Sequence, residues 1–306
     1  MHRPTNKEII DNYLNFYIHS NQSISMRKSS LNYFIGGDFF NYQEHFFDIT
    51  TKILKQYFVF LKNLNSVSIQ TRKNKWSILT SFLNFTMEDY EGFTVAIPRK
   101  TISWNGYIPK ETKINTNKDV IADKEEIQKI LNYFDENNFK HYLIFRTFVD
   151  TGMRKGELTN TLYTHVNLKY RHFHIKIGKT GEKIYNFSED LKEKLEIYLK
   201  ERKRVNANNY YLFITKSLKK YNNRTFNLIL GRVRKRLSID KNITCKTFRS
   251  TLNTLRKKEM RCSNENAKRL LGHKTNDVNI TSYTKYDYID LMNLYDNYYP
   301  YKILNL

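Results

Sequence analysis

The chain has 306 residues, of which 40% are hydrophobic; it is long enough for two domains and apolar enough to form cores, which excludes global disorder. It holds 52 Lys and Arg against 30 Asp and Glu, a formal net charge of +22, and a charge of this size favours a polyanionic partner, usually nucleic acid. The absence of any window of about 18 apolar residues argues against a transmembrane helix, and two cysteines, Cys245 and Cys262, cannot build a disulfide scaffold. We therefore expect a cytoplasmic protein that does not associate with membranes.

The positive charge is unevenly distributed. Residues 1–105 hold 12 basic and 8 acidic side chains, whereas residues 106–306 hold 40 and 22. Between Lys200 and Arg236 there are 12 basic residues and one acid. This distribution favours nucleic-acid binding over the alternative of a merely basic, soluble protein.

The first third of the chain predicts several helices. Residues 49–64 and 70–87 carry apolar side chains at helical spacing, with Thr50 and Thr71 as expected N-caps. Residues 92–117 change character, with scattered Pro, Gly, Lys and Thr and no sustained period. We therefore expect a helical domain at 1–105, a linker at 106–117 and a second domain at 118–306.

The second domain is predicted to be mainly α with a small antiparallel β-sheet. Asp123 is the expected cap of a helix, residues 139–150 form an apolar helix ended by Gly152, and residues 172–178 and 182–187 alternate around Lys179-Thr180-Gly181 as a β-hairpin. Five further helices are expected at 189–204, 223–237, 247–260, 264–271 and about 286–298.

Five short motifs follow one another in this domain. They are Thr151-Gly152-Met153-Arg154 at a helix start, Lys179 at the hairpin, Lys246-Thr247-Phe248-Arg249, Leu270-Leu271-Gly272-His273, and Tyr283 ten residues later. Each motif alone is common and has an ordinary structural explanation. Their order and spacing together resemble the tyrosine recombinase (integrase) family, over about residues 117–300.

The resemblance implies a helical core-binding domain followed by a mixed α/β catalytic domain. It implies a site-specific DNA recombinase that cleaves DNA through a 3′-phosphotyrosyl intermediate and exchanges strands through a Holliday junction, without metal, ATP or another cofactor. The partners would be double-stranded DNA and further copies of the chain: a homotetramer on two DNA sites, and a monomer or dimer in free solution. Integration, excision, dimer resolution and transposition of a mobile element are not distinguished.

The physical chemistry of these side chains agrees with that role. A phenol with a pKa near 10 is a poor nucleophile at neutral pH unless cations surround it. The resemblance makes Tyr283 the nucleophile, Arg154, Arg249 and His273 phosphate ligands, and Lys179 the general acid, with Lys183 a less favoured substitute. Lys246 stands where the family more often has His, so its role in proton transfer stays open.

Other residues are candidates for supporting roles. Glu157 is a candidate for orienting Arg154, and His172 and His174 are expected on an exposed strand face rather than at a metal site. Tyr286 and Tyr288 are fallback nucleophiles, and the resemblance favours packing of the C-terminal helix on a neighbouring protomer. The candidate DNA contacts are Lys28, Arg72, Lys73, Lys75, Arg232, Arg234, Lys235 and Arg236.

Two other functions fit part of this pattern. A type IB topoisomerase uses the same chemistry as a monomer, and Lys246 slightly favours it. The LGH motif and the separate helical N-terminal third favour the recombinase. A catalytically inactive DNA-binding module is disfavoured because all six expected functional positions are occupied.

Overall fold

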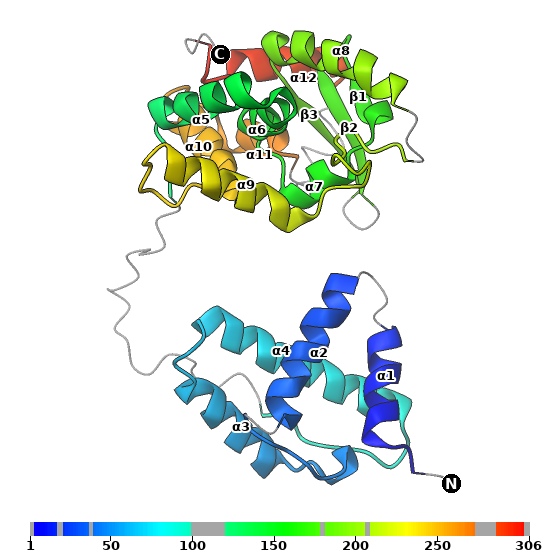
Figure 1. Ribbon diagram of the computed structural model, residues 1–306. Coiled ribbons are helices and arrows are strands. Elements are labelled where there is room, and N and C mark those ends of the chain that lie inside the picture. Colours follow the sequence, from blue (N-terminus) through cyan, green and yellow to red (C-terminus); the bar gives the residue numbers. More distant parts are fainter. Residues whose placement is uncertain are drawn as a thin grey trace. The chain divides into compact units, whose positions relative to one another are not determined.

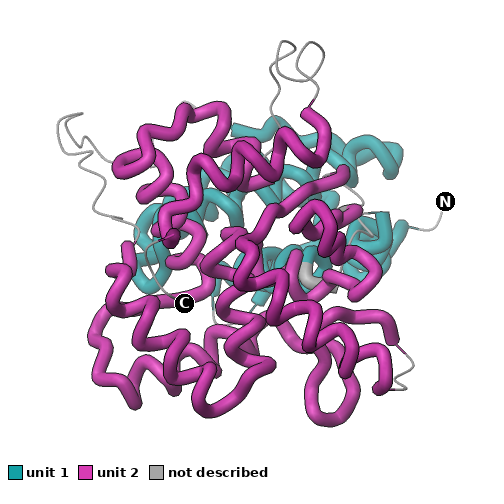
Figure 2. Tube along the Cα trace, turned by 90° about the horizontal axis from the view of Figure 1, so that it is seen from above, with its two compact units in different colours: residues 1–114 teal, residues 115–306 magenta. Residues whose placement is uncertain are grey.

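The computed structural model describes residues 3–16, 21–36, 39–98, 120–177, 181–205, 209–272 and 286–302. It divides into two compact units, residues 1–114 and 115–306 (Figure 2). The predicted linker at 106–117 lies outside the described residues. Within the ranges just given, no helix is both long and apolar enough to cross a membrane.

Unit 1 is helical. Its helices are α1 (Asn6–Phe16), α2 (Asn21–Ile35), α3 (Thr51–Asn63) and α4 (Ile69–Asp89), with a short 3₁₀ turn at Phe46–Asp48 (Figure 1). The longest helix, α4, contacts each of the other three. The core between them is strongly aromatic: Tyr13, Phe34, Tyr57 and Phe82 are almost fully buried.

The N-terminal caps fix where the helices of the chain begin. The Thr50 hydroxyl accepts the Ile53 N–H at 3.4 Å, which confirms the predicted cap of α3. The predicted cap Thr71 of α4 is wrong, because the Ser68 hydroxyl accepts the Thr71 N–H and the cap lies three residues earlier than expected. In unit 2, Asp123 precedes α5 as predicted.

Unit 2 combines helices with a small sheet (Figure 1). The helices are α5 (Lys124–Asn137), α6 (Phe139–Thr151), α7 (Lys155–Asn160), α8 (Glu189–Arg204), α9 (Asn223–Arg236), α10 (Cys245–Lys258), α11 (Asn264–Leu270) and α12 (Tyr288–Asn297), and a 3₁₀ turn spans Tyr163–His165. The strands β1 (Val166–Asn167), β2 (His172–Ile177) and β3 (Gly181–Asn186) form an antiparallel sheet in the order β1-β2-β3. The predicted fold class, mainly α with a small antiparallel sheet, is confirmed.

Helix α6 is the centre of unit 2. Every residue from Tyr142 to Thr151 is buried, and the helix contacts α5, α8, α10 and β3. A helix buried on all sides must satisfy its polar side chains internally. Arg146 and Asp150, one turn apart on α6, do so by pairing at 2.8 Å.

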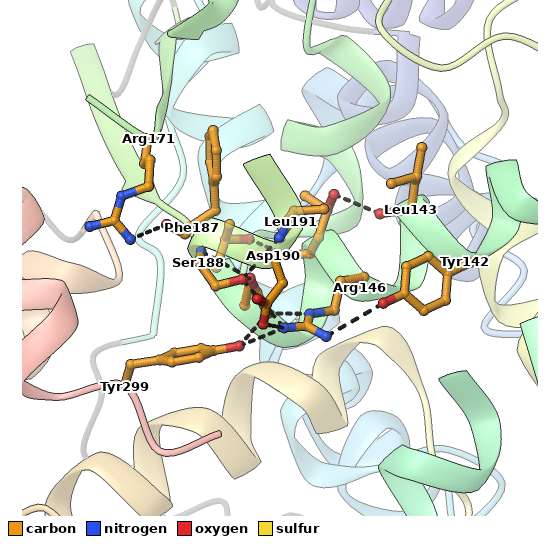
Figure 3. A network of polar contacts seen from close by, with 12 residues as sticks. Tyr142, Leu143, Arg146, Arg171, Phe187, Ser188, Asp190, Leu191 and Tyr299 are labelled. Carbon is orange, nitrogen blue, oxygen red and sulfur yellow. Dashed lines mark hydrogen bonds and ion pairs between the residues drawn. The ribbon is translucent and has the colours of Figure 1, made fainter. Parts of the chain in front are cut away.

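The buried Arg146–Asp150 pair also ties down the C-terminal segment of the chain. The Tyr299 hydroxyl donates to Asp150 at 2.8 Å and accepts from Arg146 at 3.0 Å. Ser188, which caps α8, donates its N–H to the same carboxylate at 3.1 Å. Figure 3 shows Tyr299 and Ser188 directed toward Arg146. One carboxylate on α6 therefore joins α8 to the residues that follow α12.

Within the single chain, the C-terminal segment packs on its own unit: Tyr295 and Tyr299 are buried in its core, and Arg171 pairs with Asp296 of α12. Packing of this segment on a neighbouring protomer stays a prediction. One expectation from the sequence is corrected. His172 was expected on an exposed strand face but is buried. The ring of Tyr288, at the start of α12, stacks on it with centroids 4.5 Å apart.

We expect the Asp150 network to set the local stability of α6 and α12. Asp150→Asn removes the nearer, buried counter-ion of the Arg146 guanidinium and leaves only the exposed Asp190 at 3.6 Å, which should lower the free energy of opening by about 3–5 kcal/mol. Tyr299→Phe removes one hydroxyl and should lower it by about 1–2 kcal/mol. Hydrogen exchange of the intact chain, followed in peptides from α6 and α12, measures both effects. Tyr210→Phe, at an exposed ring, is the control, and equal protection in all three variants would contradict this account.

Candidate active site

Arg154 follows a sharp turn at the end of α6. The turn residue Gly152 has φ 64°, a conformation that favours glycine. A Cβ at this position would lie 3.0 Å from Leu271 Cδ2 and 3.2 Å from Leu252 Cδ2, so both the backbone angle and the available space require glycine. Arg154 is the N-cap of α7, and its side chain is about half exposed.

Glu157, in the first turn of α7, holds Arg154 in place. Its carboxylate accepts the backbone N–H of Arg154 at 2.7 Å and the guanidinium Nη1 at 3.0 Å. It also accepts bonds from Lys183 Nζ at 2.7 Å and from the Tyr185 hydroxyl at 2.8 Å. Burial alone would raise the pKa of Glu157, but the bonds from Lys183, the Arg154 N–H and Tyr185 outweigh it and lower the pKa. This agrees with the orienting role suggested by the sequence.

Arg249 reaches the same turn from helix α10. Its Nη1 donates to the carbonyl of Gly152 at 2.6 Å, and its Nη2 donates to the carbonyl of Leu271 at 3.0 Å. The half-buried guanidinium therefore joins the Arg154 turn to the turn that precedes His273. Burial lowers the pKa of Arg249, and the positive charge of Arg154 lowers it further. The two guanidinium groups are thus close enough to interact electrostatically.

Lys246 lies in the first turn of α10, three residues before Arg249, and its side chain is exposed. Residues three apart share one face of a helix, so Lys246 adds a cation near the end of α10 that carries Arg249. Together, Arg154, Lys246 and Arg249 can neutralise a dianionic or developing negative charge, such as a phosphodiester under nucleophilic attack.

Three predicted catalytic residues, Lys179, His273 and Tyr283, lie outside the described residues. The described chain stops at Gly272 and resumes at Tyr286. The two fallback nucleophiles both make ring contacts: the Arg269 guanidinium lies 4.0 Å from the ring centroid of Tyr286, and Tyr288 stacks on His172. These contacts anchor the beginning of α12. The assignment of Tyr283 as the nucleophile rests on the sequence alone.

The predicted DNA contacts on α9 differ in exposure. Arg232 and Lys235 are exposed. Arg236 is also exposed but lies over the ring of Tyr133, 5.6 Å from its centroid. Arg234 is half-buried and donates to the carbonyl of Lys241. Arg232 and Lys235 are therefore the strongest candidates on this helix.

The candidates in unit 1 separate in the same way. Lys28 and Lys73 are exposed. Arg72 closes the loop before α4, donating to the carbonyls of Val67 and Lys62 at 3.1 and 2.5 Å. Lys75 lies on the buried face of α4, with its ammonium 3.0 Å from the ring centroid of Tyr33, and burial lowers its pKa to about 8. We therefore withdraw Lys75 as a candidate and retain Lys28 and Lys73.

Tyr185 is the residue of this site that the sequence analysis missed. It is one of 23 tyrosines and belongs to no motif. The only sequence feature that marks it is its place on the hairpin strand two residues after Lys183, which puts both side chains on one face. Within the described ranges, no group of three or more His, Cys, Asp or Glu is placed to hold a metal ion.

The lowered pKa of Glu157 predicts a pH-dependent contribution to stability. Because its pKa is lower in the folded state than its ordinary value of 4.5, the ionised carboxylate stabilises the fold above that value. The contribution is lost as the pH falls through the folded-state pKa. The difference in unfolding free energy between wild type and Glu157→Gln should be largest at neutral pH and shrink below about pH 4.5.

Denaturant unfolding at several pH values measures this difference. Glu193→Gln, at an exposed position of α8, is the control and should follow the wild type throughout. A difference that is constant from pH 7 to pH 3 would show that the Glu157 carboxylate does not act through its charge.

Comparison with known proteins assigns the chain to a family. The profile of the phage integrase family matches residues 121–288, more than half of the chain. A shufflon-specific DNA recombinase of Escherichia coli is 28% identical over 72 residues, which are 24% of this chain and only 19% of that protein.

Three solved structures share the fold at low sequence identity. A XerH site-specific recombinase bound to its difH substrate has a TM-score of 0.65 and 16% identity, covering 92% of this chain and 80% of that one. The Tn1549 transposon integrase in complex with transposon right end DNA has a TM-score of 0.64 and 15% identity, covering 94% and 97%. A lambda integrase dimer bound to a COC′ core site has a TM-score of 0.60 and 18% identity, covering 94% and 78%.

These matches favour the recombinase over the topoisomerase interpretation of the sequence. The residues matched by the family include Arg154, Lys246 and Arg249, and Arg249 donates to the carbonyl of Gly152, two residues before Arg154. The chain therefore belongs to the phage integrase family, the tyrosine-type DNA recombinases.

Proposed function

We propose that the chain is a site-specific DNA recombinase that cleaves and rejoins DNA through a 3′-phosphotyrosyl intermediate. The observation that carries the proposal is the convergence of Arg154 and Arg249 on one turn, with Glu157 fixing the first and the Gly152 carbonyl binding the second. Two guanidinium groups held in this way suit the non-bridging oxygens of a phosphodiester. The family match supports the same reaction.

The proposed cleavage step exchanges one phosphoester for another. The Tyr283 hydroxyl gives its proton to the solvent and its oxygen bonds to the phosphorus, while the bond to the 5′ oxygen breaks and that oxygen takes a proton from Lys179. Arg154, Arg249 and His273 stabilise the negative charge that builds up on the phosphoryl oxygens. Because the phosphotyrosine retains the ester, a 5′ hydroxyl can reverse the step on a new partner strand. The cycle therefore consumes no ATP.

Covalent trapping tests this reaction. Nicked duplexes tiling the DNA that flanks the gene are incubated with the chain without metal or ATP, and SDS-resistant adducts are resolved on a gel. We expect an adduct with a duplex from one flank. Tyr283→Phe should abolish the adduct and retain DNA binding, because it removes only the attacking oxygen. Arg249→Ala should slow adduct formation by about 10²–10³-fold.

Each other result has a definite meaning. Adducts of equal yield on every duplex would favour the sequence-independent topoisomerase. An adduct that survives in Tyr283→Phe would move the nucleophile to another tyrosine. Complete absence of adducts with the wild type, on duplexes that it binds, would contradict the proposed reaction.

We further propose that exposed cations of both units hold the phosphate backbone. Lys28 and Lys73 in unit 1 and Arg232 and Lys235 on α9 are exposed, and a net charge of +22 favours such binding. Contacts of this kind position a protein on DNA and carry no sequence information. The helical unit 1 would serve as the core-binding domain of a clamp.

The salt dependence of binding tests these contacts. Each cation that touches a phosphate contributes about 0.9 to the slope of log affinity against log salt. Arg232→Gln with Lys235→Gln should therefore reduce the slope by about 1.8 on a duplex of unrelated sequence, measured by fluorescence anisotropy. Lys192→Gln is the control, because Lys192 is paired with Glu189. An unchanged slope in the double variant would remove α9 from the interface.

The proposed assembly and location follow from the reaction. Exchange between two duplexes requires four cleavages, so we propose a homotetramer on two DNA sites, formed from monomers or dimers in solution. The enzyme would work where its DNA is, in the nucleoid of the cytoplasm. Sedimentation of the chain with and without a duplex that yields an adduct would establish the stoichiometry.

A further inference from the structure

Strand β3 presents two polar side chains to the inside of unit 2. Lys183 and Tyr185 alternate with Glu182 and Ile184, and both are buried, Tyr185 completely. A lysine in such a position is costly unless its ammonium is paired. We therefore expect the buried ammonium of Lys183 to be paired inside the unit.

Both side chains end on the Glu157 carboxylate, one on each oxygen. Lys183 Nζ lies 2.7 Å from Oε1, and the Tyr185 hydroxyl lies 2.8 Å from Oε2. The same two oxygens accept Arg154, through its Nη1 and its backbone N–H. Each oxygen thus accepts two bonds, which fills the acceptor sites of the carboxylate. Glu157 cannot rotate without breaking bonds to β3 and to Arg154 together.

Tyr185 extends the connection to the second arginine. Its hydroxyl donates to Glu157 and also interacts with the Arg249 guanidinium, which favours the charged form of each group. Since the hydroxyl donates its single proton to Glu157, it accepts from the Arg249 guanidinium. One phenol therefore joins the carboxylate that holds Arg154 to the guanidinium of Arg249.

The same two residues shape the turn before His273. Gly272 has φ 60°, and a Cβ there would lie 3.1 Å from Tyr185 Cζ and 3.4 Å from Lys183 Cδ. Arg249 binds the carbonyl of the preceding Leu271. Lys183 and Tyr185 thus contact three separate parts of the chain at the site: the start of α7, helix α10 and the turn after α11.

We propose that Lys183 and Tyr185 are positioning residues for phosphoryl transfer at this site: they lock Glu157, link Arg154 to Arg249 through the Tyr185 hydroxyl, and support the Gly272 turn. This inference rests on the proposed function. Lys183 acts through Glu157 and does not protonate the leaving group, because its ammonium is buried against the carboxylate. That proton comes from a different residue, for which Lys179 is the candidate.

The test compares adduct formation in single-turnover reactions on a duplex that the wild type cleaves. Tyr185→Phe keeps the ring against Gly272 and removes only the hydroxyl. It should slow adduct formation by about 10–100-fold, the loss expected for hydrogen bonds to charged groups, with DNA affinity unchanged within about twofold. Tyr198→Phe is the matched control: it removes a buried hydroxyl that donates to the Leu212 carbonyl and should react at the wild-type rate.

A second duplex separates positioning from acid catalysis. Replacing the 5′ bridging oxygen by sulfur gives a leaving group that needs no proton, because thiols are far more acidic than alcohols. Lys179→Ala should regain cleavage on this duplex, whereas Lys183→Gln and Tyr185→Phe should remain slow. This readout does not depend on stability, since each variant is compared with itself on two substrates.

Two other results would contradict the positioning roles, and a third would contradict the proposed function. Rescue of Lys183→Gln by sulfur, without rescue of Lys179→Ala, would make Lys183 the general acid and overturn its positioning role. Wild-type rates in Tyr185→Phe would overturn the link between the arginines. If the wild type forms no adduct on either duplex, the proposed function itself fails, which is distinct from a slow variant beside an active wild type.

Discussion

The candidate site depends on the backbone turn at Gly152. Its positive φ ends the buried helix α6 and sends the chain to Arg154, while its carbonyl accepts a bond from Arg249. Because a Cβ at Gly152 would meet Leu271 and Leu252 at 3.2 Å or less, the turn also sets how closely the segment before His273 approaches. A helix that is buried on all sides cannot shift to relieve a strained end. Since Arg154 follows this fixed turn and Arg249 is bonded to its carbonyl, both arginines are held in place by α6. Preorganised charge stabilisation requires such fixed positions.

Much of this fold could be predicted from the sequence because local physical rules decide it. The apolar run of α6 with its terminal glycine, the hairpin of β2 and β3, and the Thr50 cap all follow from short segments of chain. One error concerns a local choice, because Ser68 rather than Thr71 caps α4. The other arose where a distant contact decides, because the burial of His172 depends on Tyr288, more than a hundred residues away.

Part of the candidate site could be predicted in the same way. Arg154 and Arg249 lie in short motifs at a recognisable spacing, and Arg249 donates to the carbonyl of Gly152, two residues before Arg154. The roles of Lys179, His273 and Tyr283, which lie outside the described residues, stay predictions. Tyr185 stands in no motif, and its importance follows only from the pairing of β3 with β2 and from the contacts that Glu157 makes. Lys75 shows the opposite failure: a lysine in a basic cluster of the sequence turns out to lie on the apolar face of α4, beneath Tyr33. Charge counted along a chain does not reveal which cations reach the surface.

The self-contained packing of the C-terminal segment has a kinetic consequence. Tyr299 and Asp296 are bonded to Asp150 and Arg171 within one chain, so the same segment of a second molecule could take these positions only after those bonds break. Swapping segments between molecules would first require local unfolding of one tail, exposing a buried carboxylate and guanidinium to water. Such a step has a high activation enthalpy and accelerates steeply on warming. Its rate would be set by the opening of each molecule rather than by how often two of them collide.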